Sequence, residues 1–186
     1  DNIAPLYNQI GVNFFVADYR GYGRSDGSPA FRSMLSDARE VLAALRQTLQ
    51  ASGYTGPVFV MGRSMGRHAA FELAAYCQEQ IQGLIIESGR PTLGQFTQGL
   101  DEEQARTLQA AYEDKVRSIG MPVLVIHGEI DTLAPVQEAV AMYQGFQSPH
   151  KRLLTIPGAG HNDLLYLGIN EYFGAIRDFV SPPQQD

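Results

Sequence analysis

The fold of this chain is decided by the stretch Val58-Phe59-Val60-Met61-Gly62-Arg63-Ser64-Met65-Gly66. Its first four residues are apolar and largely β-preferring, which predicts a buried strand. The strand runs directly into the pattern Gly-x-Ser-x-Gly, and residues 67–78 then carry apolar side chains at helical spacing. A strand, one sharp turn and a helix would place Ser64 on a strained turn with its hydroxyl clear of the sheet. The two flanking glycines would remove Cβ atoms that collide there.

The same pattern occurs a second time, at Gly23-Arg24-Ser25-Asp26-Gly27, and context must separate the two serines. Ser25 lies several residues beyond the preceding strand pattern, and Pro29 stands between it and the next helix, which indicates a loop. Ser64 joins a strand directly to a helix. We therefore take Ser64 as the candidate nucleophile and keep Ser25 as the alternative. An ordinary serine in a strand–helix turn is the structural interpretation of Ser64.

Outward from this stretch, helical and strand patterns alternate along the chain. Helices are predicted at residues 1–10, 31–50, 67–78, 101–118, 134–146 and 163–180, and strands at residues 12–17, 58–61, 83–88, 122–127 and 152–156. This order predicts an α/β fold with a parallel sheet covered by helices on both faces, and active groups at the carboxyl ends of the strands. We expect one domain over residues 1–180, with a short lid insertion at about residues 89–120, and a flexible tail at residues 181–186.

Composition excludes several classes of protein. A net charge of −6 over 186 residues argues against nucleic-acid binding, which needs clustered Lys and Arg. No apolar run is long enough for a transmembrane segment. The single cysteine, Cys77, excludes an internal disulfide and favours a reducing compartment, so we expect a cytoplasmic protein, with the membrane periphery as the alternative. No metal-ligand spacing, dinucleotide fingerprint or phosphate-binding loop is present, so we expect neither a metal nor a cofactor.

A serine hydroxyl is a weak nucleophile until a base takes its proton. Of the four histidines, His161 is the best candidate base, because it follows the last predicted strand in a glycine-rich loop at the active edge of the sheet. A solvated loop histidine is the alternative interpretation. We expect His68 to point away from the serine hydroxyl, on the helix after it. His127 ends a buried strand, where we expect a local hydrogen bond, and His150 lies in a polar turn.

The base in turn needs a carboxylate that fixes its tautomer. Asp131 follows the fourth predicted strand and is the candidate, with the N-cap of the next helix as its structural alternative. Glu129 in the same loop is a rival, and Glu87 at the end of the third strand is a weaker one. The chain order Ser64, Asp131, His161 is the order that an α/β-hydrolase triad requires.

Four motifs make this chain resemble the α/β-hydrolase superfamily, within the branch of short-lidded serine esterases and thioesterases that includes depalmitoylase-like members. They are Asp18-Tyr19-Arg20-Gly21-Tyr22-Gly23-Arg24-Ser25, Gly62-Arg63-Ser64-Met65-Gly66, His127-Gly128-x-x-Asp131 and Pro157-Gly158-Ala159-Gly160-His161-Asn162-Asp163. The resemblance implies a serine hydrolase that cleaves an ester or thioester of a small-molecule or acylated substrate through an acyl-enzyme. A peptidase of the same fold and a non-catalytic interaction domain are the alternatives.

The chain departs from that family in two ways. Arg67 and His68 stand where the family carries small residues. The family also has three further strands and an oxyanion loop ahead of the helix at residues 1–10, so we expect an N-terminally truncated sheet. The resemblance implies the backbone N–H of Met65 as one oxyanion donor and a second donor absent from this chain, which would impair the fragment. We expect the strand at residues 12–17 to slide across to the central strand, or another chain to fill the gap by strand exchange or dimerisation.

Overall fold

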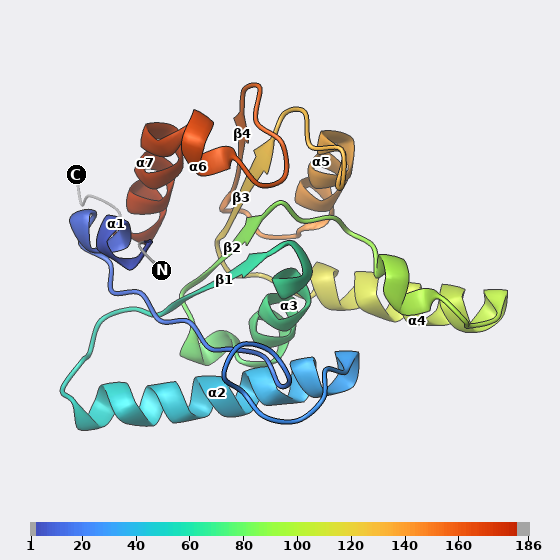
Figure 1. The fold of residues 1–186 in the computed structure, drawn as a ribbon, viewed down its shortest axis with the longest axis horizontal. Coiled ribbons are helices and arrows are strands. Elements are labelled where there is room, and N and C mark those ends of the chain that lie inside the picture. Colours follow the sequence, from blue (N-terminus) through green and yellow to red (C-terminus); the bar gives the residue numbers. More distant parts are fainter. Residues whose placement is uncertain (1–2, 182–186) are drawn as a thin grey trace.

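Four parallel strands form the centre of the computed structural model, which describes residues 3–181 (Figure 1). They are β1 (Phe59–Arg63), β2 (Gly83–Glu87), β3 (Val123–Gly128) and β4 (Lys151–Ile156), and they lie in this order across the sheet. The register places Arg63 opposite Glu87 and Gly128 opposite Ile156. The prediction of a parallel sheet is confirmed, and the ends of its strands meet at one edge.

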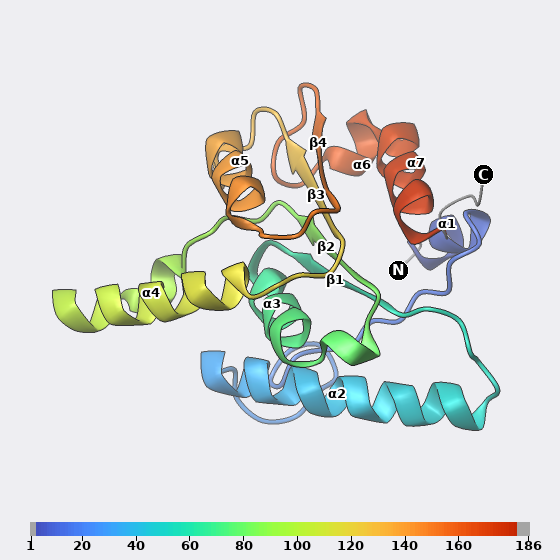
Figure 2. The ribbon, with the colours of Figure 1, turned by 180° about the vertical axis from the view of Figure 1, so that it is seen from behind.

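Helices cover both faces of this sheet, as predicted. The α-helices are α1 (Ala4–Gln9), α2 (Phe31–Ala51), α3 (Arg67–Tyr76), α4 (Glu102–Arg117), α5 (Val136–Gly145), α6 (Leu164–Leu167) and α7 (Ile169–Val180), and the short 3₁₀ helices are η1 (Ser64–Gly66), η2 (Gln78–Gln80) and η3 (Gly94–Thr97). Leu84 and Ile86 of β2 pack toward α3, α4 and α5, whereas Ile85 packs toward α1, α6 and α7. Figure 2 shows the same two layers from behind. Between residues 3 and 181, no helix is both long and apolar enough to cross a bilayer.

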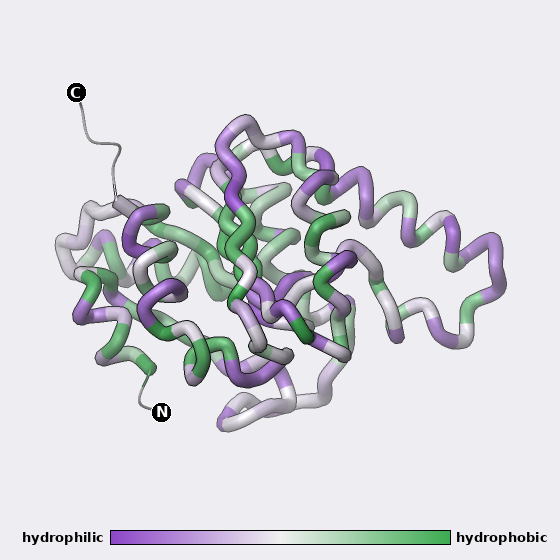
Figure 3. The backbone as a smooth tube through the Cα atoms, turned by 90° about the horizontal axis from the view of Figure 1, so that it is seen from above, coloured by the Kyte–Doolittle hydropathy of each residue, from purple (hydrophilic) through white to green (hydrophobic). Residues whose placement is uncertain are grey.

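Hydropathy along the chain follows this layering (Figure 3). Every residue of β2 and β3 is buried, because helices cover these strands from both sides. Helix α4 is polar along most of its exposed length and begins with a capping box, in which Asp101 and Gln104 bond each other's backbone N–H. Buried Glu72 of α3 pairs with Arg39 of α2 and Lys115 of α4, so ion pairs join the three helices.

The strand predicted at residues 12–17 is wrong, because this segment has no regular structure. Residues 13–17 make no backbone–backbone hydrogen bond to any described residue, and Phe15 and Val16 are 55% and 74% exposed. The expected slide onto β1 does not occur either, since β2 is the only described strand that pairs with β1. A strand pattern becomes a strand only where a neighbour pairs with its backbone, and no described strand does so here.

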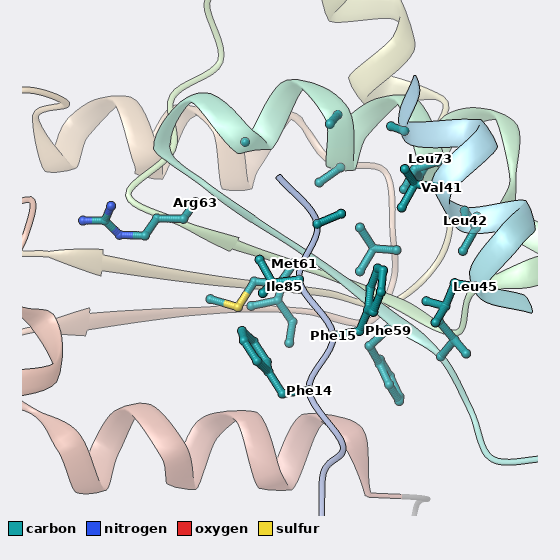
Figure 4. A pocket seen from close by; sticks show the side chains of 18 of the residues that line it. Phe14, Phe15, Val41, Leu42, Leu45, Phe59, Met61, Arg63, Leu73 and Ile85 are labelled. Carbon is teal, nitrogen blue, oxygen red and sulfur yellow. The ribbon is translucent and has the colours of Figure 1, made fainter. Parts of the chain in front are cut away.

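A cavity of about 1580 Å³ lies between this segment and β1 (Figure 4). Its apolar lining comes from the unpaired segment, β1 and α2, and the labelled residues include Phe14, Phe15, Leu45, Phe59 and Met61. The side chains of β1 that face it are only half-buried, unlike those of β2. The gap that the family resemblance predicts in the sheet is thus present as a cavity beside an open strand edge.

The prediction of a single helix at residues 163–180 is also wrong, because this segment forms two helices, α6 and α7. The break falls at Gly168, whose backbone angles of φ −144° and ψ 44° are not helical. The other helices and strands lie within a few residues of their predicted bounds. The first two residues of the predicted helix at 1–10, and residues 182–186 of the predicted tail, lie outside the part of the chain that the structure describes.

Candidate active site

Ser64 stands on the sharp turn between β1 and α3. Its φ of +50° is unusual for a residue other than glycine and costs about 1–3 kcal/mol, which the packing around it must offset. Gly62 is required there, because a Cβ at this position would lie 2.7 Å from Arg67 Cα. A Cβ at Gly66 would meet only the Tyr19 hydroxyl, at 3.3 Å, so the second glycine is less constrained than the sequence pattern suggests.

The structure brings Ser64, His161 and Asp131 together at the carboxyl edge of the sheet. His161 Nε2 lies 2.9 Å from Ser64 Oγ, and His161 Nδ1 lies 2.7 Å from Asp131 Oδ2. The imidazole side chain is 11% exposed and the carboxylate is fully buried. With Nδ1–H donating to the carboxylate, Nε2 is left as the acceptor that faces the serine hydroxyl.

Asp131 is held by its own loop as well as by the histidine. Its Oδ1 accepts hydrogen bonds from the backbone N–H of Leu133 and of Ala134, both at 2.9 Å. The residue therefore orders the turn ahead of α5, although the N-cap of that helix is Pro135. The rival carboxylates point elsewhere, since Glu129 accepts from Gly158 N–H and Glu87 from Arg63 and Tyr172.

The loop that carries His161 crosses directly over the end of β3. A Cβ on Gly128 would lie 2.4 Å from the carbonyl oxygens of Ala159 and Gly160, so only glycine permits this approach. Ile130 N–H then bonds Ala159 O at 2.9 Å. The acid loop and the base loop are thereby joined through their backbones, close to the point where Asp131 meets His161.

Of the remaining candidates from the sequence, Ser25 and His150 lie away from this arrangement, whereas His127 lies beside its acid, with Nε2 3.4 Å from Asp131 Oδ2. Ser25 donates its hydroxyl to Asp18 O at 3.0 Å, in an exposed loop, and contacts no described histidine. His127 is buried and bonds Ala134 O through Nε2 at 2.7 Å, which is the expected local hydrogen bond. His150 is exposed. Of the two Gly-x-Ser-x-Gly patterns, only that of Ser64 has its serine next to a histidine.

Arg67 has a structural role that the sequence pattern does not reveal. Its buried guanidinium donates to three carbonyl oxygens, those of Ser64, Thr92 and Arg90, at 2.8, 2.7 and 3.0 Å. It thus fastens the turn of Ser64 to the chain that leaves β2. Because no carboxylate pairs with this cation among residues 3–181, burial lowers the pKa of Arg67.

His68 has no hydrogen-bond partner for either ring nitrogen within the described residues, and it is 1% exposed. Its ring packs edge-on against Phe31 and Phe96, and tilted against Tyr112. Burial, reinforced by nearby Arg67, lowers its pKa from 6.5 to about 3. The residue therefore behaves as a neutral aromatic core residue and plays no part in the triad.

We predict that the free energy of unfolding falls less steeply in His68→Phe than in the wild type as the pH is lowered below 6.5. Between pH 6.5 and 3 the unfolded chain binds a proton at His68 and the folded chain does not, so the free energy of unfolding falls as the pH falls through this window. At pH 4 this linkage amounts to roughly 3 kcal/mol, and it vanishes near pH 7. Urea unfolding at pH 7 and pH 4 measures the difference between the two proteins at each pH.

The matched control for this experiment is His150→Gln, at an exposed position. It should follow the wild-type curve at both pH values. If His68→Phe and the wild type lose the same stability between pH 7 and pH 4, the buried imidazole does not titrate as described.

Two cavities border the serine turn. The large cavity beside β1 reaches Arg63, Ser64 and Met65. A second one, of about 150 Å³, lies between the glycine-rich loop, α2 and η3, and its lining includes Phe31, Met34, Met65 and Phe96. Leu93, just ahead of η3, is packed in the core at 1% exposure and lines neither cavity.

This fold and this serine–histidine–aspartate geometry define a class of protein, the α/β hydrolases, and the comparisons place the chain within it. The chain belongs to the Hydrolase_4 family, described as serine aminopeptidase, S33, whose model matches residues 1–94. It is 30% identical to protein bem46 of Schizosaccharomyces pombe over 184 residues, which is 95% of this chain and 60% of that protein. It is also 30% identical to human alpha/beta hydrolase domain-containing protein 17B over 177 residues, 95% of this chain and 59% of that protein.

Solved structures share the fold. The Pyrococcus furiosus esterase Pf2001 superimposes with a TM-score of 0.71 at 20% identity, covering 94% of this chain and 72% of the esterase chain. Est1E of Butyrivibrio proteoclasticus, solved with ferulic acid bound, gives a TM-score of 0.71 at 21% identity, covering 95% and 79%. The chain spans about 60% of the length of the relatives it matches in sequence.

Proposed function

We propose that the protein is a serine hydrolase that cleaves a carboxylic ester or thioester through an acyl-enzyme. One observation carries the proposal: the continuous hydrogen-bonded path from Ser64 Oγ through His161 to buried Asp131, at 2.9 and 2.7 Å. In this role Ser64 is the nucleophile, His161 the general base and Asp131 the group that orients the histidine. The esterases among the structural neighbours share this fold, which is consistent with the proposal.

The reaction takes two steps. His161 Nε2 removes the proton of Ser64 as Oγ attacks the acyl carbonyl carbon, and the resulting imidazolium gives that proton to the departing alcohol or thiol. Asp131 stabilises the imidazolium between these events. Water then enters, and His161 takes a proton from it as the water oxygen attacks the acyl carbonyl carbon. The imidazolium returns that proton to Ser64 Oγ as the acid leaves, which restores the Ser64 hydroxyl.

The negative charge that develops on the carbonyl oxygen needs donors beside Ser64. We assign one donor to the backbone N–H of Met65, the residue that follows the nucleophile in η1, just ahead of α3. The family resemblance implies a second donor on a loop that these 186 residues do not include. The loss of one such donor typically slows turnover by about 10²–10³-fold, so activity is best measured in the full-length protein.

The carboxylates around the triad favour an ester over a peptide substrate. An aminopeptidase needs an anionic group that is free to bind the substrate's α-amino group. Four acidic groups at this edge of the sheet already have partners: Asp131 with His161, Glu87 with Arg63 and Tyr172, Glu129 with Gly158 N–H, and Asp163 with Gly160 N–H. Glu138, in the first turn of α5, keeps one buried oxygen without a hydrogen-bond partner among the described residues. The family's description as serine aminopeptidase makes a peptidase the second candidate.

A substrate panel separates these candidates. We expect p-nitrophenyl acetate, butyrate, octanoate and palmitate, and the matching thioesters, to include substrates that are turned over, and aminoacyl p-nitroanilides to be inert. Turnover of the anilides alone would favour the peptidase. If a fluorophosphonate probe also fails to react with the folded full-length protein, the chain is a non-catalytic interaction domain.

We also propose that residues 89–120, which contain η3 and α4, form a short lid over the acyl group. The cavity of about 150 Å³ beside Met65 is a candidate site for that group, since a cavity of similar size can hold a benzene ring. For location, we propose the cytoplasm, with the membrane periphery as the alternative where an acylated substrate sits in a bilayer.

The open edge of β1 can bind an additional strand. Unpaired backbone groups of β1 border the large apolar cavity, and an extended peptide would supply both their hydrogen bonds and the missing packing. We propose strand exchange between two copies as its source. Light scattering that gives the mass of a dimer supports this source, and a monomer at high micromolar concentration contradicts it.

A further inference from the structure

The position between Gly62 and Ser64 is occupied by Arg63, the last residue of β1. The sequence pattern treats this position as variable, yet the side chain makes three hydrogen bonds. Arg63 Nε donates to Glu87 Oε1 at 2.8 Å, and Nη2 donates to the backbone oxygen of His161 at 2.9 Å and to Asn162 Oδ1 at 2.7 Å. One planar guanidinium therefore joins the nucleophile strand, β2 and the loop of the base.

The end of β2 holds this guanidinium in place. Glu87 is 7% exposed, and its second oxygen accepts the Tyr172 hydroxyl of α7 at 2.7 Å. The register of the sheet sets Arg63 directly opposite Glu87. Ser88 Oγ adds a second donor to the His161 carbonyl at 3.4 Å. The main chain of His161 is thus fixed from the ends of two neighbouring strands.

We propose that Arg63 is a positioning residue that holds the His161 loop so that Nε2 stays within hydrogen-bond reach of Ser64. This inference rests on the proposed function, because it concerns the same reaction. Arg63 is joined to Ser64 by one peptide bond and to His161 by a charge-assisted hydrogen bond. One side chain, held at its end by three hydrogen bonds, therefore connects the nucleophile to the loop of the base. Figure 4 shows the guanidinium pointing away from the apolar side chains of the large cavity.

The fork geometry of arginine is essential to this role. The Nε and Nη2 groups point in two directions from one plane, whereas a lysine ammonium is a single centre that cannot reach both Glu87 and the His161 loop in the same way. Misplacing a catalytic group by about 1 Å can cost about 10²-fold in rate. We therefore expect Arg63→Met to lower kcat by about 10–100-fold with KM changed little, and Arg63→Lys to restore only part of the loss.

The experiment compares ester hydrolysis by the wild type, Arg63→Met, Arg63→Lys and Arg63→Ala, the last with and without ethylguanidinium. Because the Arg63 side chain is 46% exposed, the added cation can enter the vacated site, and we expect it to raise the kcat of Arg63→Ala. A purely structural role would not respond to that cation. Arg152→Met, at the amino end of β4, removes an exposed arginine from the opposite edge of the sheet and should leave kcat unchanged.

Thermal melting of each variant shows whether it is folded. If Arg63→Met does not fold, the kcat of Arg63→Lys and the effect of ethylguanidinium on Arg63→Ala still test the proposal. A folded Arg63→Met with kcat within twofold of wild type, or no rescue of Arg63→Ala, overturns the proposal. Ser64→Ala is measured alongside. If Ser64→Ala retains full activity, the proposed function fails; if it is inactive while the Arg63 variants are unaffected, only the role of Arg63 fails.

Discussion

Ser64→Ala is expected to lower kcat for ester hydrolysis by about 10⁶-fold, to the level of a binding site without a nucleophile. The physical reason is that Ser64 Oγ is the only hydroxyl among the described residues that bonds a histidine ring nitrogen, at 2.9 Å from His161 Nε2. KM should change little, because the methyl group removes a reacting atom and leaves the surrounding cavities intact. Steady-state kinetics on the best ester of the panel measures both values.

Ser25→Ala is the matched control, since Ser25 lies in the other Gly-x-Ser-x-Gly and its hydroxyl bonds only Asp18 O. We expect kcat within twofold of wild type. Loss of activity in Ser25→Ala, with activity kept in Ser64→Ala, would reverse the assignment of the nucleophile.

Asp131→Asn is expected to lower kcat by about 10⁴-fold while the fold is retained. Oδ1 accepts the backbone N–H of Leu133 and Ala134, so in the variant the oxygen stays on that side and the new NH₂ group faces His161. His161 Nδ1 must then accept a hydrogen bond, which puts the ring proton on Nε2. In this tautomer the histidine cannot take the proton of Ser64.

Glu129→Gln provides the control for this second prediction, because Glu129 lies in the same loop as Asp131 and its carboxylate accepts the Gly158 N–H. Its activity should remain near wild type. The assignment of the acid would be wrong if Asp131→Asn kept more than about a tenth of the activity, or if Glu129→Gln were the more damaged variant.

The local pattern around Ser64 was sufficient to predict the central part of the fold. A strand, a Gly-x-Ser-x-Gly turn and a helix follow one another over a short stretch, and near-neighbour sterics alone determine this arrangement. The candidate residues Asp131 and His161 could be predicted because parallel strands bring their carboxyl ends to one edge. Their distances from Ser64 could not, since these depend on the loop crossing that Gly128 permits.

The features that the sequence did not predict correctly depend instead on partners that are distant in sequence. Residues 12–17 have a strand pattern but no strand beside them, so backbone pairing does not form. Arg63 and Arg67 look like ordinary surface residues in the sequence. Their hydrogen bonds to the loops of His161 and Thr92 become visible only when β2 and its neighbours are in place. Polar contacts between loops carry no sequence period that would reveal them.

The most direct test of the central claim is the position of a covalent adduct. The full-length protein is treated with a fluorophosphonate, digested, and mapped by tandem mass spectrometry, with His161→Ala treated in parallel. We predict one adduct per chain on Ser64, none on Ser25, and strongly reduced labelling in His161→Ala, because the imidazole at 2.9 Å activates the hydroxyl. An adduct on Ser25, or a folded protein that stays unlabelled, would contradict a triad of Ser64, His161 and Asp131.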